Sequence, residues 1–140
     1  VPALVVLFPV VFSTLWVVGS MIVLGISWNV LTVMVTALSL GIGIDYAIHM
    51  WRRFEINKSE TDDPWEALEG AIATTGVALI VSAATTALGF LVLILSPMPL
   101  VQDFGLISGI TVIFSLILCL LVLPVLLMMA EKDLSSSSDS

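Results

Sequence analysis

Four apolar runs, each long enough to cross a lipid bilayer as a helix, dominate this chain of 140 residues. About 20 apolar residues of α-helix span the roughly 30 Å of hydrocarbon in a membrane. The runs predict membrane spans at residues 4–26, 30–51, 71–95 and 104–129. A longer polar link at 52–70 joins the second span to the third, and the other connections are short. The expected fold is all-α: a polytopic membrane protein with a four-helix transmembrane bundle over residues 1–130.

Composition also indicates a membrane protein. It is 59% hydrophobic and 11% charged, whereas soluble domains are about 45–50% apolar and about 25% charged. The formal net charge of −7 is concentrated in residues 55–69 and 131–139. The basic residues form only one small cluster, Arg52 and Arg53 with Lys58 nearby, so nucleic-acid binding is not expected.

The positive charges predict the orientation of the spans. Arg52, Arg53, Lys58 and Lys132 are all the lysines and arginines in the chain. With four alternating spans, these residues and both ends of the segment fall on one side of the membrane. Cytoplasmic loops carry the excess of Lys and Arg. We therefore expect a multi-pass protein of the cytoplasmic (plasma) membrane, with both ends of this segment in the cytoplasm.

Two segments outside the spans have sequence patterns that predict their structure. In Pro64–Gly70 and just beyond it, Trp65, Leu68 and Ile72 recur at helical spacing, which predicts a short amphipathic helix on the cytoplasmic surface. An ordinary loop with one buried tryptophan is the alternative. The acidic, serine-rich tail 131–140 is expected to be disordered. Its serines are either phosphorylation sites or simply a solvated end.

Several functional classes have no support in the sequence. One His and one Cys lie on different spans, so no zinc ligand set is present. No phosphate-binding glycine motif and no Ser-His-Asp set occurs. We expect no metal, no cofactor and no enzymatic activity. The chain begins with Val1-Pro2 rather than Met and lacks a basic leader, which indicates a piece of a longer membrane protein.

Asp45 is the residue with the clearest functional meaning, because it lies inside the second apolar run. A carboxylate at the centre of a membrane span costs about 2.5–3.5 kcal/mol on insertion scales, and such residues normally face a bundle interior or a watery path. The alternative is a hydrogen bond between helices that only fixes packing. Such bonds average about 0.6 kcal/mol and would not offset the cost. The sequence therefore predicts a proton-binding carboxyl.

The neighbours of Asp45 fit this chemistry. Tyr46 supplies a hydroxyl, and His49 lies one turn further along the same helix face. A role of His49 in proton passage competes with a position at headgroup level. Gly41 and Gly43 are small enough to let another helix approach. We expect this small, polar stripe to face protein and the bulky opposite face to contact lipid or a second neighbour.

The third span carries hydroxyl groups and a glycine on one broad face. We expect this face to pack against the Asp45 helix and to relay protons through hydroxyls or water. In the alternative interpretation, the Ser and Thr side chains only bond their own backbone carbonyls one turn back. The residues concerned are Ser82, Thr85, Thr86 and Gly89.

The fourth span has its own packing signals. Gly105 and Gly109 have GxxxG spacing, which predicts close packing against another helix. Asp103 is expected at the start of this helix, where its charge meets the positive end of the dipole. Pro9 and Pro124 predict kinks in the first and fourth spans.

Four segments together resemble a known family. They are GIGIDYAIHMWRRFEI (Gly41–Ile56), VSAATTALGFLVLILS (Val81–Ser96), VQDFGLISGI (Val101–Ile110) and LPVLL (Leu123–Leu127). The chain resembles the RND superfamily, and within it the MMPL and hydrophobe-exporter branch, which is related to Patched-like and sterol-sensing membrane domains. The resemblance covers residues 4–129.

The resemblance implies a twelve-span protein of two homologous halves, in which this chain is the last four spans of one half. It further implies that Asp45 and Tyr46 meet their counterparts in the second half and carry the protons that drive export. Ser82 matches a relay hydroxyl more loosely. The implied partners are the lipid bilayer, the homologous second half, protons, and a lipid or other hydrophobic cargo.

Two other functions are compatible with the same resemblance. In the first, the chain is a sterol-sensing or receptor-like membrane domain without pumping, and Asp45 steadies a lipid-responsive bundle. Collapse of a proton gradient would stop an exporter but not such a domain. In the second, the chain is an accessory subunit of protein secretion, which the pattern of Tyr46 and His49 fits less well.

Overall fold

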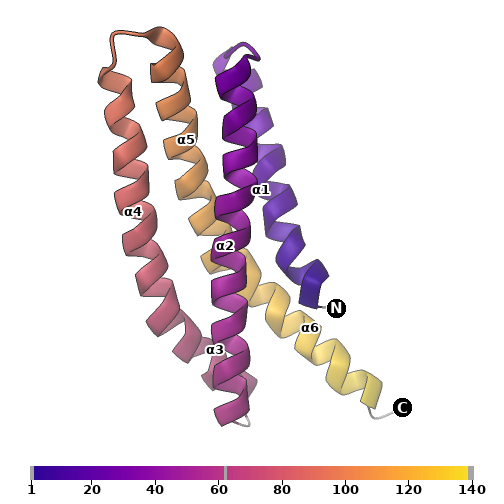
Figure 1. The fold of residues 1–140 in the computed structure, drawn as a ribbon. Helices are drawn as coiled ribbons and strands as arrows, with labels where there is room; N and C mark the ends of the chain where they lie inside the picture. Colours follow the sequence, from indigo (N-terminus) through magenta and orange to yellow (C-terminus); the bar gives the residue numbers. More distant parts are fainter. Residues whose placement is uncertain (1, 62, 139–140) are drawn as a thin grey trace.

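The computed structural model describes residues 2–61 and 63–138. Their helices form four long segments that run up and down through one bundle (Figure 1). Every regular element in these residues is helical, so the all-α fold class is confirmed. Four helices are long and apolar enough to cross a membrane: Leu7–Leu24, Val30–Glu60, Pro64–Leu95 and Pro99–Lys132.

Each segment has defined bounds. The first two are single helices, α1 (Pro2–Leu24) and α2 (Val30–Glu60). The third consists of α3 (Pro64–Ala71), a π-helical turn η1 (Ile72–Gly76), α4 (Val77–Val92) and a 3₁₀ turn η2 (Leu93–Leu95). The fourth consists of α5 (Pro99–Ile117), a second π-helical turn η3 (Leu118–Val122) and α6 (Leu123–Ser138).

Local chemistry fixes the turn between α1 and α2. Gly25 has a φ of 66°, a left-handed conformation that glycine adopts without steric cost. Asn29 then caps α2, since its side chain accepts hydrogen bonds from the backbone N–H groups of Leu31 and Thr32. The Thr32 hydroxyl accepts in return from the Asn29 N–H at 2.8 Å. This capping box starts α2 at Val30.

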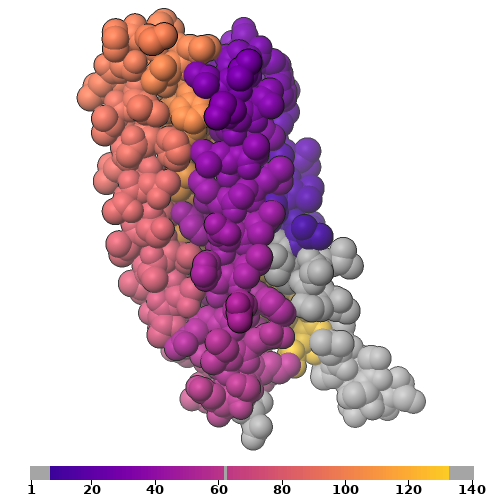
Figure 2. Space-filling model, in the orientation of Figure 1, coloured from indigo at the N-terminus to yellow at the C-terminus, as the bar shows by residue number. Residues whose placement is uncertain are grey.

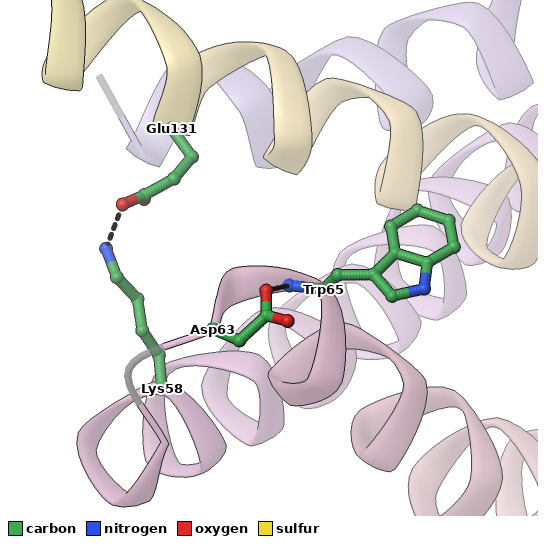
Figure 3. A network of polar contacts seen from close by, with 4 residues as sticks. All are labelled: Lys58, Asp63, Trp65 and Glu131. Carbon is green, nitrogen blue, oxygen red and sulfur yellow. Dashed lines mark hydrogen bonds and ion pairs between the residues drawn. The ribbon is translucent and has the colours of Figure 1, made fainter.

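The link expected at 52–70 is mostly helical. α2 continues to Glu60 because residues 52–60 contain no helix-breaking Pro or Gly. Asp63 caps α3 by accepting from the Trp65 N–H at 2.9 Å (Figure 3), and Pro64 takes the first position, where a missing N–H costs nothing. The short helix predicted at Pro64–Gly70 is therefore present. Because Trp65 is exposed, the alternative of a loop with a buried tryptophan is wrong.

The fourth segment also differs at its ends from the sequence prediction. α5 begins at Pro99 rather than 104, so Asp103 lies within the helix and not at its start. α6 runs to Ser138, whereas disorder is predicted for 131–140; the helix continues because 131–138 contain neither Pro nor Gly. An ion pair between Lys58 Nζ and Glu131 Oε1, 2.6 Å long, ties α6 to the end of α2 (Figure 3). Residues 139–140 lie outside the described residues.

The two prolines inside spans behave differently. α1 continues through Pro9 as one helix. Pro124 lies just after the π-helical turn Leu118–Val122, and α6 turns away from the axis of α5 (Figure 1). Proline cannot donate an N–H and its ring crowds the carbonyl four residues earlier, so the wider turn before Pro124 relieves that conflict. The predicted kink is thus present in the fourth span.

The interior has two apolar clusters with a polar contact between three helices. One cluster surrounds Met50 and Leu123, and the other surrounds Met21 and Ile107. The buried Ser13 hydroxyl of α1 lies 2.9 Å from Ser115 Oγ of α5 and 3.3 Å from Ser39 Oγ of α2. This triad links α1, α2 and α5, and the sequence analysis did not anticipate it. Its serines are separated by 26 and 102 residues, so no local pattern relates them.

Candidate functional site

A polar groove of about 620 Å³ lies between α2 and the segment formed by η1 and α4. Figure 2 shows the face of the molecule on which α2 and α4 are both visible. The groove brings together four residues predicted to form the proton site: Asp45, Tyr46, His49 and Ser82. The other lining residues are Arg53, Thr74, Thr75, Ala78 and Leu79.

One face of α2 supplies the charged side of the groove. Asp45, His49 and Arg53 follow one another at intervals of four residues, so they project from the same helix face at steps of about 6 Å. In the sequence, Arg53 was assigned only to the basic cluster with Arg52 and not to the Asp45 site. The four-residue spacing that connects Asp45 to His49 would have identified it if extended by one more step.

Tyr46 is held from two directions. Its side chain is buried and lies beside the Ser82 side chain of α4 in the groove. Its backbone carbonyl accepts a hydrogen bond from Cys119 Sγ of η3, 3.3 Å away. Asp45, the preceding residue on α2, is exposed in the groove instead. The pair thus combines a buried tyrosine side chain with an open carboxyl.

Two predicted relay residues lie apart from the groove lining. Thr85 Oγ1 donates to the carbonyl oxygens of Val81 (3.1 Å) and Ser82 (2.9 Å). Thr86 Oγ1 donates to the Ser82 carbonyl at 2.8 Å. Both hydroxyls therefore satisfy their own helix, as in the alternative interpretation of this face. The expected packing of the whole face against α2 does not occur in the described residues, because α4 packs on α5 instead.

The glycines predicted to mediate packing divide into two groups. A Cβ on Gly105 would lie 2.5 Å from the Phe90 carbonyl oxygen, so α4 and α5 meet in close contact there. Gly109 packs in the same interface against Leu91, and Gly43 packs against Val10. A Cβ on Gly41 or Gly89 would meet nothing within 4 Å.

The stripe of α2 expected to face protein is only partly covered. The described chain buries Ser39, Gly43 and Ala47, of which Ser39 and Gly43 contact α1, and leaves Gly41 and Asp45 exposed. Within the described residues the Asp45 part of this stripe is therefore uncovered, and the prediction that it faces protein stays a prediction about the complete protein. The Ser39 face and the Asp45 face of α2 both carry small side chains. In the described residues, neighbouring helices cover the Ser39 face and leave the Asp45 face open.

The available chemistry is that of a carboxyl, an imidazole, a guanidinium and hydroxyls. No group of three or more His, Cys, Asp or Glu side chains is placed to hold a metal ion in the part of the chain that the structure describes. These groups can exchange protons and form hydrogen bonds with one another or with water. A single carboxyl on a membrane-spanning helix, with polar neighbours on two helices, is typical of proton-conducting sites.

Four membrane-crossing helices with a polar groove between two of them define a multi-pass membrane protein. The chain belongs to the MMPL family, whose family model matches residues 1–137. This agrees with the resemblance seen in the sequence.

Three curated proteins, named only as membrane proteins, are similar to this chain. MJ1562 of Methanocaldococcus jannaschii is 33% identical over 128 residues, which cover 91% of this chain and 33% of the relative. ActII-3 of Streptomyces coelicolor is 33% identical over 104 residues, 74% of this chain and 15% of the relative. SCO6666 of the same organism is 30% identical over 92 residues, 66% of this chain and 13% of the relative. The chain spans at most about a third of their lengths, and no solved structure matches it.

Proposed function

We propose that this chain is the transmembrane module of a proton-driven MMPL-type exporter, whose cargo is a lipid or another hydrophobic molecule. The observation that carries the proposal is Asp45, which lies midway along a membrane-spanning helix in a groove with Tyr46, His49 and Ser82. Membership of the MMPL family supports it. The module is not an enzyme, because its groups move protons and break no substrate bond.

In the proposed mechanism Asp45 takes up a proton and releases it on the other side. Tyr46 offers a hydroxyl beside the carboxyl, its backbone carbonyl accepts from Cys119 Sγ of η3, and Ser82 extends the polar path on α4. His49 lies toward the Arg-rich end of α2 and connects the carboxyl to that side. Each proton that returns through 100 mV supplies about 2.3 kcal/mol for export.

The open side of the groove is a suitable contact surface for a second half of the complete protein. Asp45 and His49 are exposed in this chain, and a homologous second half of the complete protein would cover them. The length of the relatives, at least about three times that of this chain, supports such a half. Once covered, the carboxyl is separated from both aqueous phases except along a hydrated path.

The orientation proposed from the sequence is compatible with the fold. Arg52, Arg53 and Lys58 lie near the end of α2, at the same end of the bundle as α3 and α6 (Figure 1). Lys132 of α6 belongs to the same end. The positive-inside rule makes this end cytoplasmic and places the protein in the cytoplasmic membrane.

The test is the substitution Asp45→Asn in the complete protein, reconstituted in vesicles with an imposed proton gradient. Asparagine keeps the size and hydrogen-bonding capacity of the side chain but cannot carry the proton, so gradient-driven export is expected to stop. Asp103→Asn, the same change on α5 away from the groove, is the matched control and should export normally. Undiminished gradient-driven export by Asp45→Asn contradicts the proposal and favours a sterol-sensing domain without pumping.

A further inference from the structure

At the cytoplasmic end of the groove, one nitrogen of the Arg53 guanidinium is buried without an acceptor. Arg53 Nε is shielded from solvent, yet it has no hydrogen-bond partner. The ion pair among the described residues joins Lys58 to Glu131 and does not involve Arg53. A donor that is covered but unpaired costs free energy, and more so when it is charged.

The residues around Arg53 cannot supply the missing anion. Thr74 and Thr75 face it across the groove, but a hydroxyl carries no charge, and Thr74 Oγ1 already donates to the Gly70 carbonyl at 2.8 Å. Asp45 lies eight residues earlier on the same helix, a rise of about 12 Å. An ion pair requires about 4 Å or less. In the described residues no ion pair within 4 Å involves Arg53, so an acceptor for the guanidinium nitrogens that stay accessible is available only from another part of the protein, from lipid or from water.

The three cations at this end of α2 differ in their surroundings. Lys58 is paired with Glu131. Arg52 is exposed and does not line the groove, so it can reach lipid headgroups directly. Arg53 is half-buried and lines the groove on the face that carries Asp45. A group that covers Asp45 will also cover Arg53, whereas lipid phosphate has freer access to Arg52.

We propose that Arg53 forms an ion pair with a carboxylate of the homologous second half, which enters the open side of the groove. The planar guanidinium binds a carboxylate through two parallel hydrogen bonds, so the pair fixes the position of one half relative to the other. It sets the depth at which the second half meets Asp45. This inference rests on the proposed function in that it takes the covering group to be the second half of an exporter.

The experiment uses the complete protein in nanodiscs and proteoliposomes, with Arg53→Gln, Arg53→Lys and the control Arg52→Gln. Breaking a covered charge pair is expected to lower proton-driven export about tenfold or more and to lower the unfolding temperature. Arg53→Lys keeps the charge and should recover part of the export rate and part of the unfolding temperature. Arg52→Gln should resemble the unchanged protein. Equal behaviour of Arg53→Gln and Arg52→Gln overturns the proposal.

Two further measurements identify the acceptor. In nanodiscs of phosphatidylcholine alone, the loss of thermal stability in Arg53→Gln should persist; if it appears only with anionic lipid, the acceptor is a lipid headgroup and the proposal is wrong. Arg53→Glu, combined in turn with Arg at each acidic position of the facing span of the second half, should restore export for one pair. Failure of every such swap also overturns the proposal.

The outcome is separable from that of the proposed function. If Asp45→Asn stops export while Arg53→Gln has no effect, the ion pair is wrong and the exporter stands. If Asp45→Asn exports normally while Arg53→Gln is destabilised in all lipids, the contact stands and the proton mechanism is wrong.

Discussion

The two sides of α4 are built in opposite ways. Toward α5, the helix is in close contact: the Phe90 carbonyl oxygen lies 2.5 Å from the position that a Cβ of Gly105 would take, and Leu91 packs on Gly109. Toward α2, the helix borders a groove of about 620 Å³ with an exposed carboxyl and hydroxyls. The chain completes one interface by itself and leaves the other open. Stability is therefore expected to depend on the first side and function on the second.

The strongest test of this difference is Gly105→Ala in the complete protein. The added methyl group would lie 2.5 Å from a backbone oxygen, which cannot move as a flexible side chain can. We expect a loss of about 1–3 kcal/mol, since overpacking a close interface forces the helices apart. Gly89→Ala is the control, because a Cβ there meets nothing within 4 Å. Unfolding transitions in detergent measure both, and equal losses would contradict the comparison.

The next test concerns the buried serine triad on the closed side of the bundle. Ser13→Ala removes the hydroxyl that contacts both Ser115 and Ser39. We expect a loss of about 1 kcal/mol, because two buried hydroxyls lose a partner in a site without access to water. In the control Ser20→Ala the lost hydroxyl bonds only its own helix, at the Val17 carbonyl. If Ser13→Ala is no less stable than Ser20→Ala, the triad does not hold the three helices together.

The spans could be predicted from sequence because membrane crossing depends on the length of an apolar run, which is a local property. The residues at which the helices end could not be predicted in this way. Hydropathy falls where the chain leaves the hydrocarbon, but the backbone remains helical wherever caps and propensity allow it. This is why α2 reaches Glu60 and α5 begins at Pro99, each beyond the apolar boundary.

The sequence predicted most of the polar residues of the candidate site, but not which face of α2 the rest of the chain covers. Asp45 stands out in the sequence because a charged residue within a membrane span is costly and is usually functional. Which face of α2 is buried could not be deduced, since Ser39, Gly43 and Ala47 are as small as the residues on the Asp45 face. The choice depends on where α1 and α5 lie, and that is a non-local property. Arg53 differs, because the four-residue spacing of Asp45 and His49 already points to it in the sequence, and only its position at the groove needs the structure.

The smallest expected effect on stability belongs to the open side, in Ser82→Ala. Ser82 is exposed and interacts with the buried Tyr46 side chain at the edge of the groove. In a hydrated groove, water replaces the lost hydroxyl, so the free energy of unfolding should change by no more than about 0.5 kcal/mol. Proton-driven export should nevertheless slow, because the path from Asp45 loses one donor. A destabilisation as large as that of Ser13→Ala would mean that water does not reach Ser82 in the complete protein and that no hydrated path runs past it.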